Sequence, residues 1–393
     1  MMRYLSKTKY LEGLQCPKLL WCEYNRKALF PPTPPVLQFA FDEGHRVGAL
    51  AQKMFPGGIL IARKFNPEEQ SLQSLEAVKS RKPLFEAGFV YKNAYALADI
   101  LAPVEENAWD LIEVKSSTGV KDEHYHDAAF QKYVFEGAGL KIRQCFIMYI
   151  NKDFVRSGAV DPNQFFLRQD ITKQTAILSR QIDKAVDAML KTLNSQDMPA
   201  IEIGPYCSSP HECPLVDYCW KDLPEGNVFT LHQGGQRCFD LLEQGVSRIT
   251  DIPADYKLNA KQVIQIEAYR KNQPYIDKEA LSEFLRRLVY PVYFLDFETI
   301  APAIPVYDNA GPYKSIPIQF SLHIVEKEGA GPKHYGYLAP GKEDPRPEIL
   351  RRLKELLGSN GSILAYNASF EKRCLKESAF VYPEYLEWVK NLD

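Results

Sequence analysis

The chain has 393 residues, of which 45% are hydrophobic and 25% are charged, and its formal net charge is −2. This balance is typical of an ordinary globular protein, and the length predicts two or three domains. The charge excludes a uniformly basic nucleic-acid-binding chain, although it is compatible with a local basic patch. No apolar run approaches the roughly 18 residues that span a bilayer, and the first residues lack the apolar core of a secretion signal. We therefore expect a cytoplasmic protein with no membrane partner.

The first 225 residues predict an α/β domain in which helices and strands alternate. In chain order the predicted elements are an extended connector at 31–35, a helix at 39–55, strands at 94–101 and 108–115, a helix at 126–137, a strand at 145–150 and a helix at 171–193. The first two strands are separated by the six residues APVEEN, which indicate a turn. The sequence therefore predicts a β-hairpin at this point.

The remainder of the chain predicts two further regions. Residues 226–289 contain several short helical patterns, which predict a helical linker or DNA-binding module. The region 290–393 predicts strands at 292–298, 317–325 and 334–338, a helix at 346–357, a strand at 362–366 and a helix at 369–377. Three strands followed by a helix, a strand and a helix form the opening order of an RNase H-like fold. We expect a partial RNase H-like α/β domain here.

A candidate active site is formed by acidic residues of the predicted hairpin. Asp99 lies among apolar residues of the first strand, and Glu113 and Lys115 lie two positions apart on the second. Alternate residues of a strand share a face, so Glu113 and Lys115 point the same way and the hairpin can bring Asp99 beside them. Two adjoining carboxylates suit Mg²⁺ or Mn²⁺, and a lysine can stabilise the charge that develops on a phosphate. The alternative interpretation is a solvated strand face with an ordinary ion pair.

This arrangement resembles the PD-(D/E)xK nuclease superfamily, above all the RecB-like exonucleases of the CRISPR-associated and AddB types. The resemblance implies a restriction-endonuclease-like core with a central mixed sheet flanked by helices. It implies that His45, within EGHRVG, joins Asp99 and Glu113 as a metal ligand, and that Gln131 on the following helix positions substrate. Those families carry Gln-x-x-x-Tyr on this helix, whereas this chain has phenylalanine four positions after Gln131. Tyr133 is therefore the candidate aromatic contact to substrate.

A second candidate site is a set of four cysteines. Clustered cysteines in a reducing cytoplasm more often bind metal than form disulfides. Cys16, Cys207, Cys213 and Cys219 are the candidate ligands, with Cys22 as an alternative to Cys16. Four thiolates suit either zinc or a [4Fe–4S] cluster. One cysteine before the nuclease core and three after it resembles the iron–sulfur RecB-like nucleases and implies a structural [4Fe–4S] cluster, while the wide C-x5-C-x5-C spacing leaves zinc as an alternative.

A third candidate site lies in the C-terminal region. Asp296 and Glu298, in LDFET, lie two positions apart on a predicted strand and share a face. The pair resembles the first motif of DnaQ-type (DEDD) exonucleases, in which two metal ions clamp a phosphodiester. AYNASFEKRCL resembles the second motif, with Glu371 in place of aspartate. The resemblance implies a second Mg²⁺ or Mn²⁺ site, and the alternative is a strand with two exposed acids.

Together these features predict a metal-dependent deoxyribonuclease that acts as an exonuclease on single-stranded or end-accessible DNA. The sequence contains no P-loop, so a helicase would have to be a separate partner. The alternatives are a non-catalytic nucleic-acid-binding or assembly subunit of a DNA repair or defence complex, and a ribonuclease.

Overall fold

The computed structural model describes residues 3–105 and 107–392. The chain forms two compact units, Met1–Tyr149 with Phe166–Ile276 and Ile150–Phe165 with Asp277–Asp393. The predicted helical region 226–289 is thus divided between the units, and an insertion from the N-terminal half belongs to the second unit. Within the described residues, no helix is both long and apolar enough to cross a membrane.

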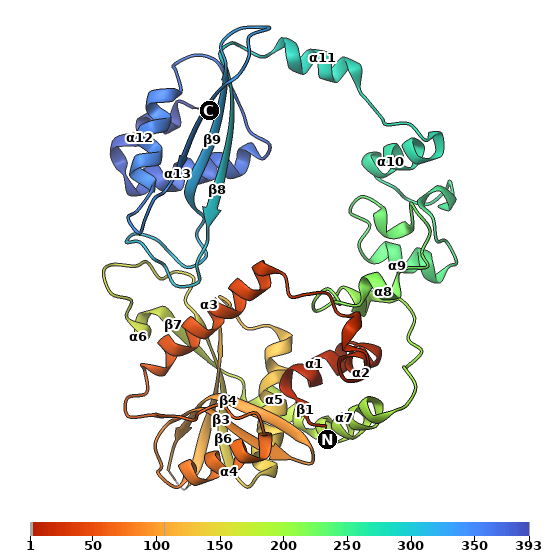
Figure 1. Ribbon diagram of the computed structural model, residues 1–393, viewed down its shortest axis with the longest axis vertical. Helices are drawn as coiled ribbons and strands as arrows, with labels where there is room; N and C mark the ends of the chain where they lie inside the picture. Colours follow the sequence, from red (N-terminus) through yellow and green to blue (C-terminus); the bar gives the residue numbers. More distant parts are fainter. Residues whose placement is uncertain (1–2, 106, 393) are drawn as a thin grey trace. The chain divides into compact units, whose positions relative to one another are not determined.

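The first unit is built on a seven-stranded mixed sheet (Figure 1). The strands follow the order β2-β3-β4-β5-β6-β7, and β1 pairs with β4. The β3–β4 and β4–β5 pairs are antiparallel, whereas the β1–β4, β2–β3 and β5–β6 pairs are parallel. The strands are β1 (Leu5–Ser6), β2 (Ile59–Leu60), β3 (Leu84–Tyr91), β4 (Ala94–Pro103), β5 (Ala108–Lys115), β6 (Lys141–Ile150) and β7 (Phe166–Asp170).

The predicted hairpin is confirmed as the β4–β5 pair, in which Ile100 lies opposite Ile112. Position 106 of the predicted turn lies outside the described residues. The strand β3, which pairs with the other edge of β4, was absent from the sequence prediction.

Helices flank this sheet, so the unit is a mixed α/β structure. The helices of the unit are α1 (Lys7–Gln15), α2 (Pro17–Asn25), α3 (Pro35–Gln52), α4 (Pro67–Val78), α5 (Asp122–Gly137), α7 (Thr172–Asn194), α8 (Val216–Cys219), α9 (Gln236–Glu243) and α10 (Ala260–Lys271). The last two do not cover the sheet, because Leu241 of α9 and Ile266 of α10 pack in a separate hydrophobic cluster. The predicted helix 171–193 is confirmed as α7, which buries Ile182, Val186 and Leu193 at helical spacing.

The core that positions the candidate active site lies between β4 and α5. Ala94, Ala96 and Ala98 of β4 are buried in the same cluster as Phe130 and Val134 of α5. Alanines occupy little space, so the helix can pack closely on the strand. Burial of a phenylalanine side chain such as Phe130 stabilises the fold by about 2–3 kcal/mol. This packing fixes α5 beside the end of the hairpin.

The second unit contains a four-stranded sheet of order β10-β9-β8-β11. The β10–β9 and β9–β8 pairs are antiparallel, and β11 is parallel to β8. Its elements are α6 (Pro162–Phe165), α11 (Lys278–Arg286), β8 (Val292–Ile300), β9 (Ile316–Val325), β10 (Lys333–Leu338), α12 (Arg346–Leu356), β11 (Ser362–Leu364), α13 (Ala368–Val381) and α14 (Leu386–Lys390). Leu295 and Phe297 of β8 pack in one core with Leu350 of α12 and Leu375 of α13. The alternate residue Phe294 is 44% exposed, so the opposite face of β8 is open in the described residues.

The insertion Ile150–Phe165 is tied to this second unit through backbone hydrogen bonds. The Arg156 N–H donates to the Ala310 carbonyl oxygen at 3.0 Å, and the Asn309 N–H donates to the Arg156 carbonyl oxygen at 2.9 Å. The Arg156 guanidinium also donates to the Pro305 carbonyl oxygen at 2.7 Å. The segment that leaves β6 is therefore a structural part of the second unit.

Candidate active site

The β4–β5 hairpin brings Asp99, Glu113 and Lys115 together near the end of β5. Ile100 pairs with Ile112, so the antiparallel register places Asp99 next to Glu113 and Val114. The Asp99 Oδ2 accepts a hydrogen bond from the Val114 N–H at 2.7 Å. The Lys115 ammonium lies 2.9 Å from the Glu113 Oε1. The spatial arrangement predicted from the sequence spacing is thus present for these residues.

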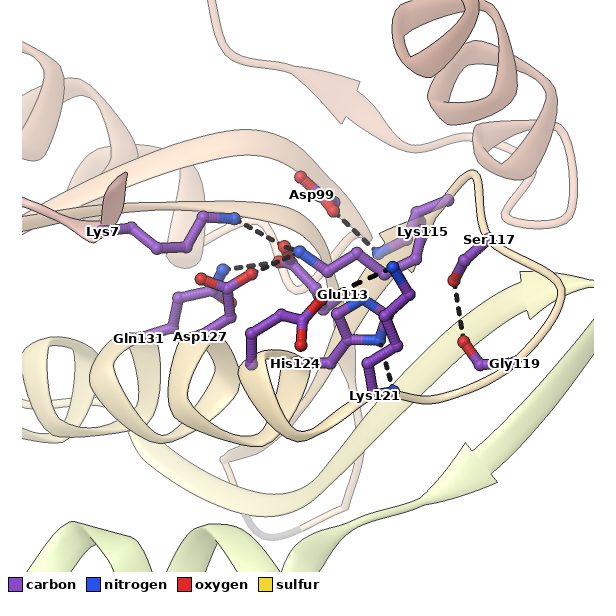
Figure 2. Close-up of polar contacts among 12 residues, drawn as sticks. Lys7, Asp99, Glu113, Lys115, Ser117, Gly119, Lys121, His124, Asp127 and Gln131 are labelled. Carbon is purple, nitrogen blue, oxygen red and sulfur yellow. Dashed lines mark hydrogen bonds and ion pairs between the residues drawn. The ribbon is translucent and has the colours of Figure 1, made fainter. Parts of the chain in front are cut away.

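Glu113 is the centre of this site, as Figure 2 shows. Its side chain is 1% exposed, and three side chains converge on its carboxylate. Lys7, next to β1, lies 2.5 Å from Oε1, which Lys115 also approaches. The Gln131 Nε2 donates to Oε2. A buried carboxylate is stable only with such partners, because the loss of hydration costs several kcal/mol per ion.

The helix α5 supplies a further carboxylate through Asp127. Its Oδ2 pairs with the Lys115 ammonium, which therefore bridges Asp127 and Glu113. Asp127 is 3% exposed and Gln131 is 0% exposed. Within the described residues, Oδ1 of Asp127 and Oε1 of Gln131 are buried without a hydrogen-bond partner. Unsatisfied buried oxygens are uncommon in folded proteins and indicate that the site can accept a further polar or cationic group.

The electrostatics of the site separate its two hairpin carboxylates. Burial opposes ionisation of Glu113, but Lys115 and Lys7 outweigh it and lower the pKa of Glu113. Burial and the negative charge of Glu113 raise the pKa of Asp99 to about 7, against the opposing influence of Lys7. Glu113 is therefore the permanent anion, whereas Asp99 carries a proton for part of the time at neutral pH.

Both lysines remain charged despite their burial. Burial opposes the charge of Lys115, but Glu113 and Asp127 outweigh it and raise its pKa. The same balance between burial and the attraction of Glu113 raises the pKa of Lys7. By contrast, burial together with the charge of Lys115 lowers the pKa of His124 to about 4. His124 is thus neutral, and its Nδ1 accepts a hydrogen bond from the Lys121 N–H at 3.2 Å.

These properties fit a hard divalent cation. Carboxylate oxygens are the ligands that Mg²⁺ and Mn²⁺ prefer, and a cation beside Asp99 would remove the repulsion that disfavours its ionised form. In the described residues, no three His, Cys, Asp or Glu side chains lie close enough to hold an ion as they stand. Coordination would therefore require side-chain rearrangement, above all of Lys7, which occupies Oε1 of Glu113.

The remaining predicted residues of this site occupy two different positions. His45 lies on the exposed side of α3, and its charge acts on Glu86 of β3. Tyr133 faces away from Glu113, because its hydroxyl donates to the Asp183 Oδ1 of α7 at 2.7 Å. The structure therefore brings Gln131 to Glu113 but directs Tyr133 toward α7.

The four predicted cysteine ligands all line one cavity, although among the described residues no three of them lie close enough to hold an ion as they stand. Cys16, Cys207, Cys213 and Cys219 all line it, together with apolar residues that include Leu215. Burial raises the pKa of Cys213 to about 11, and the pKa of Cys219 is raised for the same reason. Four sulfur donors in one apolar cavity fit a thiophilic metal centre, which would bind them as thiolates.

Cys22, the alternative to Cys16, is fully buried in the same apolar cluster and is not part of the lining of this cavity. Its Sγ approaches the Met198 Sδ at 3.9 Å. The remaining cysteines, Cys145, Cys238 and Cys374, belong to three other hydrophobic clusters.

The third predicted site is divided between two faces of the second unit. Asp296 and Glu298 are exposed on β8 and alternate with the buried Leu295. Glu371 of α13 is 6% exposed, and its Oε2 is buried without a hydrogen-bond partner within the described residues. It lines a cavity of about 890 Å³ together with Tyr293 and Leu295, which point away from the face that carries Asp296. The contacts of these residues do not bring Glu371 to the acidic pair.

Sequence reasoning missed Lys7, Asp127 and His124. Asp127 lies four positions before Gln131, and this spacing on a helix could have indicated that both face the same group. Lys7 carries no comparable signal, because its contact with Glu113 depends on the parallel pairing of β1 with β4.

Comparison with known proteins adds one finding about the second unit. A family profile described as a domain of unknown function (DUF2779) matches residues 293–393. The match covers the four-stranded sheet from Tyr293 onward with the helices α12, α13 and α14, and the candidate active site lies outside it. No curated protein matches the chain.

Proposed function

We propose that the first unit is a divalent-cation-dependent nuclease that hydrolyses DNA phosphodiester bonds. The single observation that carries this proposal is the convergence of Lys115, Lys7 and Gln131 on the buried Glu113, beside Asp99. A mixed sheet with a hairpin that carries Asp-x13-Glu-x-Lys, followed by a helix that carries glutamine, supports a PD-(D/E)xK core of the RecB-like type.

In this proposal Asp99, Glu113 and His45 hold the cation, which supplies Lewis acidity toward the scissile phosphate. Lys115 is a permanent cation fixed between Glu113 and Asp127, so it can stabilise negative charge that develops on a phosphate oxygen. Without the cation the pKa of Asp99 is raised to about 7, so binding of the cation at neutral pH would release a proton from Asp99. The Gln131 amide holds the orientation of the Glu113 carboxylate.

The cysteine cavity supports a structural metal centre that links the two ends of the nuclease domain. Cys16 lies between α1 and α2, near the start of the chain, whereas the other three ligands follow α7. Closing so long a loop restricts the unfolded chain and stabilises the fold. The order of the cysteines favours a [4Fe–4S] cluster over zinc. Protein purified without oxygen should be brown and contain iron, and colourless protein with one bound zinc would overturn this assignment.

The second unit supports an RNase H-like fold by its topology. Strand β8 lies between β9 and β11, and β11 is the parallel neighbour. This is the arrangement expected if β8, β9, β10 and β11 are the first four strands of that fold. Because the contacts of Glu371 and Asp296 do not unite them, the nuclease proposal rests on the first unit alone.

The test of the proposal is a cleavage assay with Mn²⁺ on matched single-stranded DNA and RNA. We expect wild type to degrade DNA faster than RNA, and Asp99→Asn and Lys115→Met to reduce the rate at least 100-fold. Glu69→Gln, which changes an exposed carboxylate of α4, is the control and should retain the rate. Equal trace activity in wild type and Asp99→Asn would favour a non-catalytic nucleic-acid-binding subunit, and faster RNA cleavage would favour a ribonuclease.

A further inference from the structure

Glu86 of β3 has an unusual backbone conformation beside the candidate active site. Its φ is +55°, a region that L residues other than glycine rarely adopt. Among the described residues, it is the one non-glycine residue of positive φ that lies inside a β-strand. Its neighbours Phe85 and Ala87 pair with Ile100 and Ala98, so Glu86 lies across from Asp99.

The side-chain alternation of both strands is interrupted at this point. On β3, Leu84 and Ala87 enter the same core cluster although they are three positions apart. On β4, Ala98 and Leu101 do the same. A regular strand would send residues three apart to opposite faces. Both strands are therefore distorted at Glu86 and Asp99, the position that the β3–β4 pairing skips.

Buried polar groups of α4 maintain this distortion. The Gln70 Nε2 donates to the Glu86 carbonyl oxygen at 3.1 Å, and the Gln70 side chain is fully buried. The Ser74 Oγ, also buried, accepts a hydrogen bond from the Gly88 N–H at 3.0 Å. A strained backbone persists only where its surroundings hold it, and such residues cluster at functional sites.

The Glu86 carboxylate lies in the electrostatic surroundings of the active site. Within the described residues it forms no hydrogen bond or ion pair, although burial raises its pKa. Lys7 and Glu113 both act on it, and so do Arg63 and the α3 residue His45. The charge of Glu86 is therefore within reach of Glu113 of the hairpin and of His45, and its backbone lies across from Asp99.

An independent observation indicates that this site accepts a ligand. Oδ1 of Asp127 and Oε1 of Gln131 are buried without partners in the described part of the chain. Both side chains point toward Glu113 and Lys115 in Figure 2. A cation with bound water beside the carboxylates of Asp99 and Glu113 would supply partners for these two oxygens.

We propose that Glu86 supplies a further carboxylate ligand to the divalent-cation site, between His45 and Asp99. The proposal rests on the proposed nuclease function and names a ligand that the spacing of Asp99, Glu113 and Lys115 does not include. The strained backbone of β3 is then the means by which a strand residue directs its carboxylate to the ion.

The test is a titration of the full chain with Mn²⁺, in which the concentration of free ion is measured by electron paramagnetic resonance. We expect Asp99→Asn to abolish Mn²⁺ binding. Glu86→Gln should weaken the Mn²⁺ affinity of the same site at least tenfold. Glu69→Gln changes an exposed carboxylate of α4 in the same way and should leave the affinity unchanged. Circular dichroism of each variant verifies the fold.

Glu86→Gly provides a second variant that separates a ligand from a structural residue. Glycine adopts φ of +55° without strain, so this variant should melt at a higher temperature than wild type without cation, yet bind Mn²⁺ as weakly as Glu86→Gln. If both Glu86 variants change the Mn²⁺ affinity less than threefold while Asp99→Asn abolishes binding, Glu86 is not a ligand. That result would leave the proposed nuclease function standing. Wild type without a Mn²⁺ site would overturn the proposed function as well.

Discussion

Asp99→Asn should stabilise the cation-free protein, and the size of the gain should depend on pH. Burial and the charge of Glu113 raise the pKa of Asp99 from an ordinary value of 3.8 to about 7. One pKa unit corresponds to about 1.4 kcal/mol, so removal of the Asp99 charge can raise the free energy of unfolding by at most roughly 4 kcal/mol. Because Asp99 is half-buried and water screens its charge, we expect a gain of about 2 kcal/mol.

The direction of the pH dependence follows from proton binding. Between pH 4 and pH 7 the folded state binds a proton on Asp99 that the unfolded state has released, so wild-type stability from this group falls as pH rises. Asparagine avoids this loss, and its side-chain oxygen can still accept from the Val114 N–H. The gain should therefore be near zero at pH 4 and complete above pH 7.

The assay is urea denaturation of both proteins in EDTA at several pH values between 5 and 8. The gain in free energy of unfolding should increase from pH 5 to about pH 7 and level off above it. With saturating Mn²⁺, wild type should recover stability by binding the ion, and Asp99→Asn should not. A gain that is constant with pH, or a loss of stability at pH 8, would refute the assigned electrostatics of the site.

Three further predictions concern the same site and the cysteine cavity. Lys7→Gln removes one cationic partner of the buried Glu113, so the free energy of unfolding should fall by about 1–3 kcal/mol. The measurement is urea denaturation in EDTA at pH 8, and an unchanged value would contradict that pairing. Mn²⁺ affinity should fall by up to tenfold for each pH unit below about pH 7, because the ion competes with the proton on Asp99. Calorimetry measures this dependence, and an affinity that does not change from pH 5.5 to 7 would argue against the competition. Cys213→Ser should abolish visible absorbance and bound metal, whereas Cys374→Ser, in the core of the second unit, should retain both; equal metal content in the two variants would exclude the cavity as the metal centre.

Much of the fold was accessible from the sequence wherever a single periodicity held along an element. The helix α7 shows this, because Ile182, Val186 and Leu193 repeat at helical spacing. The strand β3 was missed, because the alternation of its buried residues changes phase at Glu86. The grouping of Ile150–Phe165 with the second unit depends on contacts with residues near Ala310, which no local pattern indicates.

The candidate active site follows the same division between local and distant contacts. Asp99, Glu113 and Lys115 were predictable because a hairpin fixes the register between two neighbouring strands. Lys7 was not, because its position depends on β1, which joins the sheet far from its neighbours in sequence. Glu86 carried no signal either, since a positive φ at a glutamate is a property of the folded strand.

In the proposed site, Asp99, Glu113 and His45 surround one divalent cation. Anomalous X-ray scattering from a Mn²⁺-soaked crystal of the full chain would locate this ion. We predict a peak within about 2.5 Å of carboxylate oxygens of both Asp99 and Glu113, with the Lys7 ammonium displaced from Oε1. A crystal in which Lys7 remains paired with Glu113 and no anomalous density lies beside Asp99 would contradict the account.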